Sequence, residues 1–146
     1  MINYLSLFTF AMILISHQPD PNPDFNLDEY KWERRILIIF SPDTKQSEYQ
    51  SQIQELKGQK EGMKERHMLI VHVLSGDLAK LQLEEPKEIN QEQLRDRFDI
   101  QREEFTVLLI GKDGGIKMKS NQALEIKDIF GQIDAMPMRQ REMRNQ

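Results

Sequence analysis

The sequence predicts an α/β domain in which helices cover both faces of a central sheet. Three apolar runs, residues 36–40, 68–74 and 105–110, have the length of strands and contain no Asp, Glu, Lys or Arg. Strands that are apolar on both faces lie in the middle of a sheet that is covered on each side. The segments between these runs have the apolar spacing of amphipathic helices. The length of 146 residues suits one domain of ordinary size.

A fourth strand is expected directly after the third. In residues 116–120 apolar and basic side chains alternate, which is typical of a strand with one exposed face. The residues that precede it, Lys112-Asp113-Gly114-Gly115, have the composition of a tight turn. Residues 105–120 are therefore expected to form an antiparallel hairpin.

A long helix is predicted between the first two strands. Ser47 and Gln50 have the spacing of a capping box at its start, and Gly58 and Gly62 weaken its second half. The residues that would share its apolar face are Tyr49, Ile53, Leu56 and Met63.

Two further helices follow. The helix before the third strand is expected to begin with a capping box of Asn90 and Gln93. The helix after the hairpin has a continuous apolar stripe, which Pro137 is expected to end or kink. The stripe consists of Ile126, Ile129, Phe130, Ile133 and Met136.

The predicted order is βαβ, then α, then ββα, which is the minimal layout of a thioredoxin-like three-layer sandwich. In that fold the redox site lies where the first strand leads into the first helix, whose N-terminus stabilises a thiolate. The corresponding position here is Ser41-Pro42-Asp43, and the chain contains no cysteine. The sequence therefore excludes thiol–disulfide chemistry, thiolate zinc sites and iron–sulfur ligation. Serine does not replace the thiol without a general base.

The N-terminal segment predicts export. Residues 1–16 carry no charge, and their apolar run is shorter than the ~20 residues that span a bilayer. They are interpreted as a signal peptide that directs the chain to a periplasm or the cell exterior. An uncleaved anchor and a buried element of the domain are the alternatives. Residues 17–25 are rich in proline and predict a linker, so the domain is expected to span residues 26–146.

No metal, cofactor or catalytic residue is predicted. His67 and His72 are expected on opposite faces of a strand, where they cannot share a metal ion. Asp96 and Asp99 lie near the end of a predicted helix and are interpreted as solvated charges.

Basic residues gather on the predicted hairpin and at the C-terminus. On a chain of net charge −4 such a patch could bind a protein or an anionic polymer, or it could simply keep a strand and a helix soluble. The candidate binding residues are Lys112, Asp113, Lys117, Arg139, Arg141 and Arg144. Nucleic acid is not expected as a partner, because the chain is acidic and has no aromatic residues interleaved with the basic ones. The oligomeric state is left open.

Three stretches resemble the domain-of-unknown-function 4174 family, and the likeness covers residues 26–144. They are residues 32–42 (WERRILIIFSP), 105–117 (FTVLLIGKDGGIK) and 133–144 (IDAMPMRQREMR). The resemblance implies a thioredoxin-like fold without redox cysteines. It also implies an extracellular adhesion or matrix role in the animal members, which carry sushi repeats or several copies of this domain. It implies no enzymatic activity and no catalytic residues.

Two functions remain open. In the first, the chain is a non-catalytic binding module that uses the hairpin and residues 136–144. In the second, it is an enzyme whose cysteine-free site gathers a small anionic substrate with Lys112 and Arg139. The second function requires titratable side chains to converge in one pocket. The residues concerned are His72, Asp43, Asp134 and Arg139.

Overall fold

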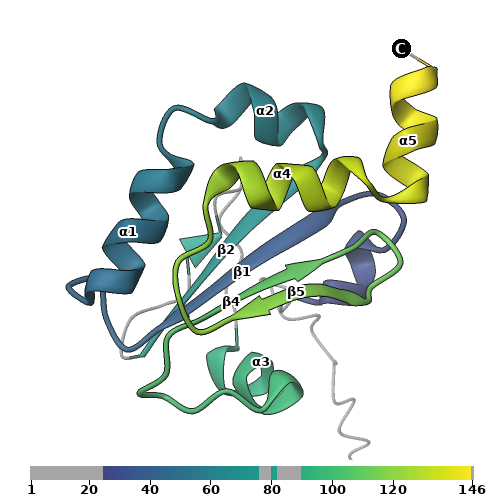
Figure 1. Ribbon diagram of the computed structural model, residues 1–146. Coiled ribbons are helices and arrows are strands. Elements are labelled where there is room, and N and C mark those ends of the chain that lie inside the picture. The colour runs from purple at the N-terminus through teal and green to yellow at the C-terminus, as the bar shows by residue number, and fades with distance from the viewer. Residues whose placement is uncertain (1–24, 76–79, 82–89, 146) are drawn as a thin grey trace, which may run out of the picture.

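The fold is a mixed five-stranded sheet with helices on both faces, which confirms the predicted α/β class (Figure 1). The computed structural model describes residues 25–75, 80–81 and 90–145. The predicted signal peptide, residues 1–16, lies outside the described residues. So does the predicted linker, residues 17–25, apart from Phe25, which is buried in the core. Within the described part, no helix combines the length and the apolar character that crossing a bilayer requires.

The elements follow the predicted order with four additions. The strands are β1 (Arg35–Ser41), β2 (Met68–Leu74), β3 (Lys80–Leu81), β4 (Thr106–Ile110) and β5 (Ile116–Ser120). The helices are η1 (Leu27–Tyr30, a 3₁₀ helix), α1 (Ser47–Leu56), α2 (Lys60–Glu65), α3 (Gln91–Phe98), α4 (Ile126–Asp134) and α5 (Pro137–Arg144). The additions are η1, α2 as a helix separate from α1, β3, and α5 as a helix separate from α4.

The strand order in the sheet is β3-β2-β1-β4-β5. The central strand β1 runs parallel to β2, where Ile38 pairs with Val71, and antiparallel to β4, where Ile38 pairs with Leu108. β4 and β5 form the predicted antiparallel hairpin, with a shift of register between Leu109 and Ile110. β5 is therefore an edge strand, and its residues are exposed or only partly buried.

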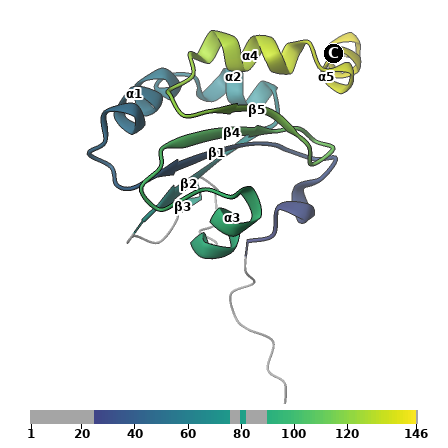
Figure 2. The same ribbon diagram turned by 60° about the horizontal axis from the view of Figure 1, so that its bottom comes forward.

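Helices cover the two faces of the sheet unequally (Figure 2). α1, α2, α4 and α5 lie on one face, and η1 and α3 lie on the other. Alternate residues of β1 supply both sides of the core. Ile36, Ile38 and Phe40 join the cluster that contains Leu94 of α3, and Leu37 and Ile39 join the cluster that contains Ile129 and Ile133 of α4. Burying each of these side chains stabilises the fold by about 1.5–3 kcal/mol.

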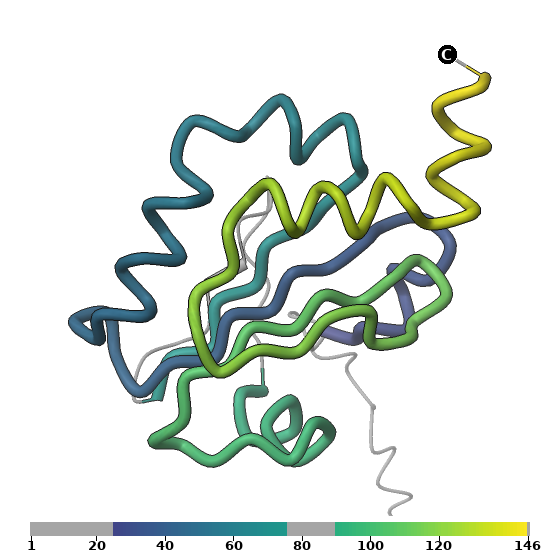
Figure 3. The backbone as a smooth tube through the Cα atoms, viewed as in Figure 1, coloured from purple at the N-terminus to yellow at the C-terminus, as the bar shows by residue number. Residues whose placement is uncertain are grey.

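The region between β1 and β2 differs from the single helix that was predicted. It contains two helices, which the backbone trace shows as separate coils (Figure 3). The chain turns between them at Gly58, whose φ of +77° suits glycine. The predicted capping box of Ser47 and Gln50 is wrong, because Gln46 is the N-cap and its side chain makes no capping hydrogen bond. Asp43, earlier in the loop, accepts the backbone N–H of Gln46 instead.

The other two helix boundaries agree with the sequence. The side chain of Asn90 accepts a hydrogen bond from the backbone N–H of Gln93 at 3.0 Å, which confirms Asn90 as the cap of α3. α4 ends at Asp134, and Pro137 is the first residue of α5, a position where proline's missing N–H leaves no bond unmade.

Candidate functional site

The loop between β1 and α1, which contains the predicted site Ser41-Pro42-Asp43, is held by its own hydrogen bonds. Ser41 is fully buried, and its Oγ lies 2.8 Å from the carbonyl oxygen of Asp43 and 2.9 Å from Oε1 of Gln46. Oδ1 of Asp43 accepts the backbone N–H groups of Lys45 and Gln46. Within the described residues, the Ser41 hydroxyl contacts no histidine and no carboxylate that could activate it as a nucleophile.

Arg95 of α3 closes the same end of the sheet from the opposite face. Its guanidinium donates to the carbonyl oxygens of Ser41, Val73 and Gln101 and to Oγ of Ser75. Burial lowers the pKa of Arg95 from its ordinary value. Arg95 was not among the residues predicted from the sequence, although it directly follows Leu94, a core residue. Through these contacts Arg95 has a structural role, because it joins the ends of β1 and β2, which are far apart in sequence.

His72 lies in β2 beside α1. Its Nδ1 is 3.1 Å from the hydroxyl of Tyr49, and the two rings meet edge to face. Burial lowers the pKa of His72, so the ring is neutral at pH 7. His67 instead precedes β2 with a φ of +51° and lies beside Lys112, so the two histidines do not meet. Among the described residues, no group of His, Asp and Glu side chains is placed to hold a metal ion.

Lys112 and Glu142 form an ion-pair cluster with Arg35 at the start of β1. Oε1 of Glu142 lies 2.7 Å from Nζ of Lys112, and its Oε2 lies 3.1 Å from Nη1 of Arg35. Nζ of Lys112 is also 2.8 Å from Nδ1 of His67. These four residues, Arg35, His67, Lys112 and Glu142, are called the Glu142 cluster below. Arg35 is fully buried and Lys112 nearly so, which places two cations in the interior against one carboxylate.

Arg139 lies next to this cluster and is held by hydrogen bonds and ion pairs of its own. It is fully buried, its Nε lies 3.2 Å from Asp134, and its Nη1 donates to the carbonyl oxygen of Glu65 at 3.0 Å. The side chain of Glu65 accepts a further hydrogen bond from Arg139. Asp134 also pairs with Arg66 at 2.6 Å. α5 is thus joined to α2, to α4 and to the sheet by charged groups.

The structure distributes the six predicted binding residues among three environments. Lys112 and Arg139 come close together, but carboxylates of the chain itself fill their surroundings. Asp113 and Lys117 pair with each other at 2.7 Å within the hairpin turn. Arg141 and Arg144 are exposed on α5, and neither makes an ion pair within the described residues.

The four residues that the enzymatic alternative needs in one pocket lie in three separate places. Asp134 and Arg139 contact each other, His72 contacts Tyr49, and Asp43 binds backbone amides at the start of α1. No described pocket is lined by any of the four.

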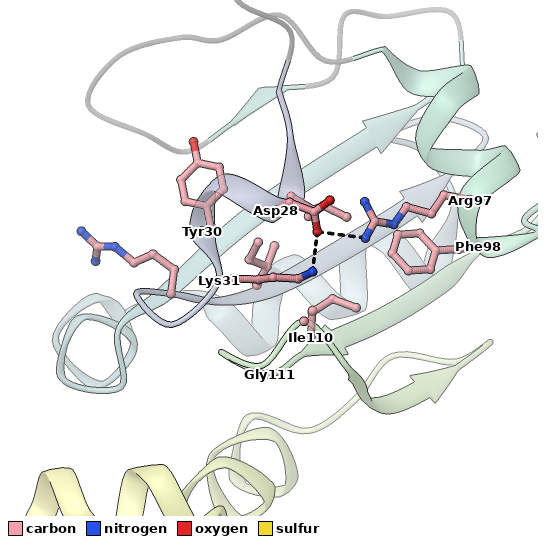
Figure 4. A pocket seen from close by; sticks show the side chains of 11 residues that line it. Asp28, Tyr30, Lys31, Arg97, Phe98, Ile110 and Gly111 are labelled. Atoms are coloured by element: carbon pink, nitrogen blue, oxygen red, sulfur yellow. Dashed lines mark hydrogen bonds and ion pairs between the residues drawn. The ribbon is translucent and has the colours of Figure 1, made fainter.

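Two of the pockets in the described part of the chain are lined in part by residues of α3. One lies between η1, α3 and β4, where Asp28 pairs with Lys31 at 2.9 Å and with Arg97 at 3.4 Å (Figure 4). The space inside it, about 10 Å³, is that of a single water molecule. The other is an open polar cleft of about 350 Å³ at the C-terminal end of α3, and acidic residues predominate around it. Its lining residues are Glu92, Arg95, Asp96, Asp99, Ile100, Gln101, Arg102 and Glu103.

Three segments meet at Lys112, and we call them together the Lys112 end: residues 31–34, 112–119 and 139–144. The backbone N–H of Trp32 donates to the carbonyl oxygen of Lys112 at 2.6 Å, and the Lys112 side chain reaches Glu142. The large hydrophobic side chains that are exposed among the described residues all belong to these segments. They are Trp32 at 64%, Ile116 at 51% and Met143 at 37% exposure.

The Lys112 end is also rich in positive charge. Its segments contain eight Lys or Arg residues and three Asp or Glu residues, in a chain whose net charge is −4. Trp32 has a φ of +69°, a conformation that side-chain-bearing residues rarely adopt. From the sequence, Trp32 was noted only as part of the motif at residues 32–42. The signal that could have found it is the placement of the chain's one tryptophan between Lys31 and Glu33, ahead of a buried strand.

Comparisons with known proteins place the chain among uncharacterised domains. The family model described as "Domain of unknown function (DUF4174)" matches residues 26–142. The chain is 27% identical over 133 residues to coiled-coil domain-containing protein 80 of Danio rerio, an alignment that covers 80% of this chain and 15% of that protein. It is 28% identical over 128 residues to sushi repeat-containing protein SRPX2 of Xenopus laevis, with coverages of 80% and 26%. The chain thus spans about a quarter or less of the length of these relatives.

Proposed function

The chain belongs to the DUF4174 family of domains of unknown function, and from that premise we propose that it is an exported, non-catalytic module that binds a protein or an anionic polymer. A matrix-like adhesion role is part of this proposal. The apolar, uncharged residues 1–16 support export. The architecture is proposed to be thioredoxin-like, supported by the parallel β1–β2 pair joined through α1 and α2 and by the β4–β5 hairpin followed by α4.

The β1–α1 loop supports a non-catalytic role. The chain has no cysteine, and the Ser41 hydroxyl and the Asp43 carboxylate are both engaged in hydrogen bonds that hold the loop. Together with Arg95, these bonds fix the end of the sheet at which a thioredoxin-like domain would react.

The observation that carries the proposal is the gathering of exposed apolar and basic side chains at the Lys112 end. Tryptophan and arginine are the residues that most often dominate the energetics of protein interfaces. The left-handed backbone of Trp32 costs about 1–2 kcal/mol, and the structure around it holds the residue exposed at that cost. Such strain at an exposed aromatic residue supports a contact role for it.

A site-specific cross-linking experiment tests the proposal. A photoreactive phenylalanine analogue is placed at Trp32 and, in a matched variant, at Lys57, an exposed residue in the turn between α1 and α2. Irradiation in the native envelope or medium should give a discrete adduct from position 32 and none from position 57. Reversing Arg141 and Arg144 to Glu should weaken the adduct, whereas the same reversal at Lys57 and Lys60 should not. Equal adducts at both positions, or none at either, contradict the proposal.

A further inference from the structure

We propose that the Glu142 cluster is a carboxylate-binding site which Glu142 fills from within the chain and which an acidic segment of a partner protein can fill in its place. This inference rests on the proposed function, because the cluster forms the base of the Lys112 end. It assigns the partner a chemistry, and it gives α5 the role of a competing occupant.

The cluster has the composition of a built anion site. Arg35 presents its guanidinium side by side to the two oxygens of Glu142, with Nη1 at 3.1 Å from Oε2 and Nη2 at 3.3 Å from Oε1. Nζ of Lys112 completes the contact at 2.7 Å. Paired guanidinium N–H groups match the geometry of a carboxylate, which makes this the strongest class of side-chain hydrogen bond.

Positive charge in the cluster exceeds what Glu142 neutralises. Arg35 and Lys112 share its single negative charge. Arg139, whose Nη1 lies 3.8 Å from Oε2, is already paired with Glu65 and Asp134 and does not offset this excess. Nε of Arg35 is buried and has no acceptor among the described residues. A buried donor without a partner costs free energy, so a ligand with further acceptor oxygens gains by entering.

The cluster can be reached from solvent once α5 moves. The side chain of His67 is 43% exposed and that of Glu142 19%, so these two residues form its outer wall. No residue of α5 belongs to either hydrophobic core cluster, and Arg139 is its one buried residue. A helix of eight residues is unstable alone, so the contacts of Arg139 and Glu142 decide whether α5 stays in place.

A carboxylate on a protein fits this site better than one on a sugar polymer. Exposed apolar side chains lie around the site. Met143 directly follows Glu142 in α5, and Trp32 and Ile116 lie on the two segments that meet at Lys112. An acidic segment with apolar neighbours could cover these side chains, whereas a charged, hydroxyl-rich polymer would leave them in water.

The experiment removes the internal occupant from the full chain. In Glu142→Ala the cluster loses its carboxylate, and in Glu61→Ala an exposed carboxylate of α2 is lost with the same change of net charge. Thermal unfolding is measured at pH 7 in sodium acetate and in sodium chloride of equal ionic strength. We expect acetate to raise the Tm of E142A above its value in chloride, and to leave wild type and E61A unchanged.

The second measurement is the binding of a fluorescent peptide in which Glu and Val alternate. We expect E142A to bind it about tenfold more tightly than wild type or E61A, because no side chain of the protein competes for the cluster. A peptide in which Lys and Val alternate should not bind. Should E142A fail to fold, Glu142→Gln keeps the volume of the side chain without its charge and is expected to change peptide binding in the same direction.

Three results would overturn the inference. The first is an equal effect of acetate on E142A and E61A. The second is equal peptide affinity in E142A, E142Q and wild type. The third is binding of a heparin oligosaccharide that E142A strengthens while the peptide stays unbound. If the cross-link at position 32 forms in any of these cases, the proposed function stands and only the carboxylate site is wrong.

Discussion

At the scale of single residues, Gln52 shows how one buried amide joins two elements. It is fully buried in α1, its Nε2 donates to the carbonyl oxygen of Leu124 at 3.1 Å, and its Oε1 accepts the N–H of Leu124 at 2.8 Å. Leu124 lies in the loop between β5 and α4, where no strand offers it a partner. The Gln52 side chain therefore satisfies both its backbone C=O and its backbone N–H. A leucine at position 52 would bury these groups without partners.

We expect Gln52→Leu to lower the free energy of unfolding by about 2 kcal/mol, since two buried backbone groups lose their hydrogen bonds. Gln54→Leu, on the exposed side of the same helix, is the control and should change it by less than about 0.5 kcal/mol. Urea unfolding followed by circular dichroism measures both. Equal effects of the two substitutions would show that the Gln52–Leu124 contact does not stabilise the fold.

The carboxylates that hold α5 predict a loss of stability in acid. Burial alone would raise the pKa values of Asp134 and Glu142, but the hydrogen bonds and charges of their Arg and Lys partners outweigh it, so both pKa values lie below the ordinary 3.8 and 4.5. The unfolded chain then binds these protons first. The contribution is complete above about pH 4.5 and is lost as the pH falls below it. Urea unfolding between pH 7 and pH 3 should show this decline, and Glu142→Gln should make it shallower.

The residue scale also shows what sequence reasoning could not reach. Lys112 and Arg139 were candidates for a partner surface because basic residues gather on the hairpin and at the C-terminus of an acidic chain. Lys112 pairs with Glu142, 30 residues away in sequence, and Arg139 pairs with Glu65, 74 residues away, as well as with the nearby Asp134. Only the fold brings the two distant partners into contact. By contrast, local spacing correctly predicted the hairpin turn that contains Asp113. Such a turn places residues four apart beside each other, and Asp113 and Lys117 pair across it.

At the scale of elements, local chemistry decided which predictions succeeded. The three apolar runs became β1, β2 and β4, because continuous β-branched segments can be buried on both faces of a sheet. The cap at Asn90 is confirmed, since a capping side chain acts within three residues. The start of α1 was harder to predict, because the acceptor for the backbone N–H of Gln46 is Asp43, which lies outside the helix.

Two glycines give opposite predictions for the same substitution. Gly114 in the hairpin turn has a φ of +81°, and a Cβ there would lie 2.6 Å from the side chain of Lys31. Gly131 in α4 has nothing within 4 Å of the position of its Cβ. We expect Gly114→Ala to destabilise the fold by about 1 kcal/mol or more and Gly131→Ala to stabilise it by about 1 kcal/mol. Thermal unfolding compares the two, and a shift of the same sign in both would contradict this account.

At the scale of the whole molecule, the two ends of the sheet differ in whether their side chains are bonded within the fold or exposed. At one end the β1–α1 loop and Arg95 use their polar groups within the fold. At the other end, which is the Lys112 end, Trp32, Arg141 and Arg144 are exposed. Buried and half-buried ion pairs such as Lys112–Glu142 hold these segments together. Core packing therefore fixes the sheet, whereas electrostatic contacts fix the surface that is proposed to bind.

This division predicts where the molecule opens first. Amide hydrogens in β1 lie between two hydrophobic clusters and should exchange only through global unfolding, whereas those in α5 depend on the contacts of Arg139 and Glu142. In hydrogen–deuterium exchange at pH 7 we expect α5 to exchange through local opening, well before β1. Glu142→Gln should speed exchange in α5 about tenfold, because it removes a charge-assisted contact, and should change β1 far less. Exchange of α5 and β1 at the same rate would mean that the helix opens only with the core, and α5 could not then yield its place to another carboxylate.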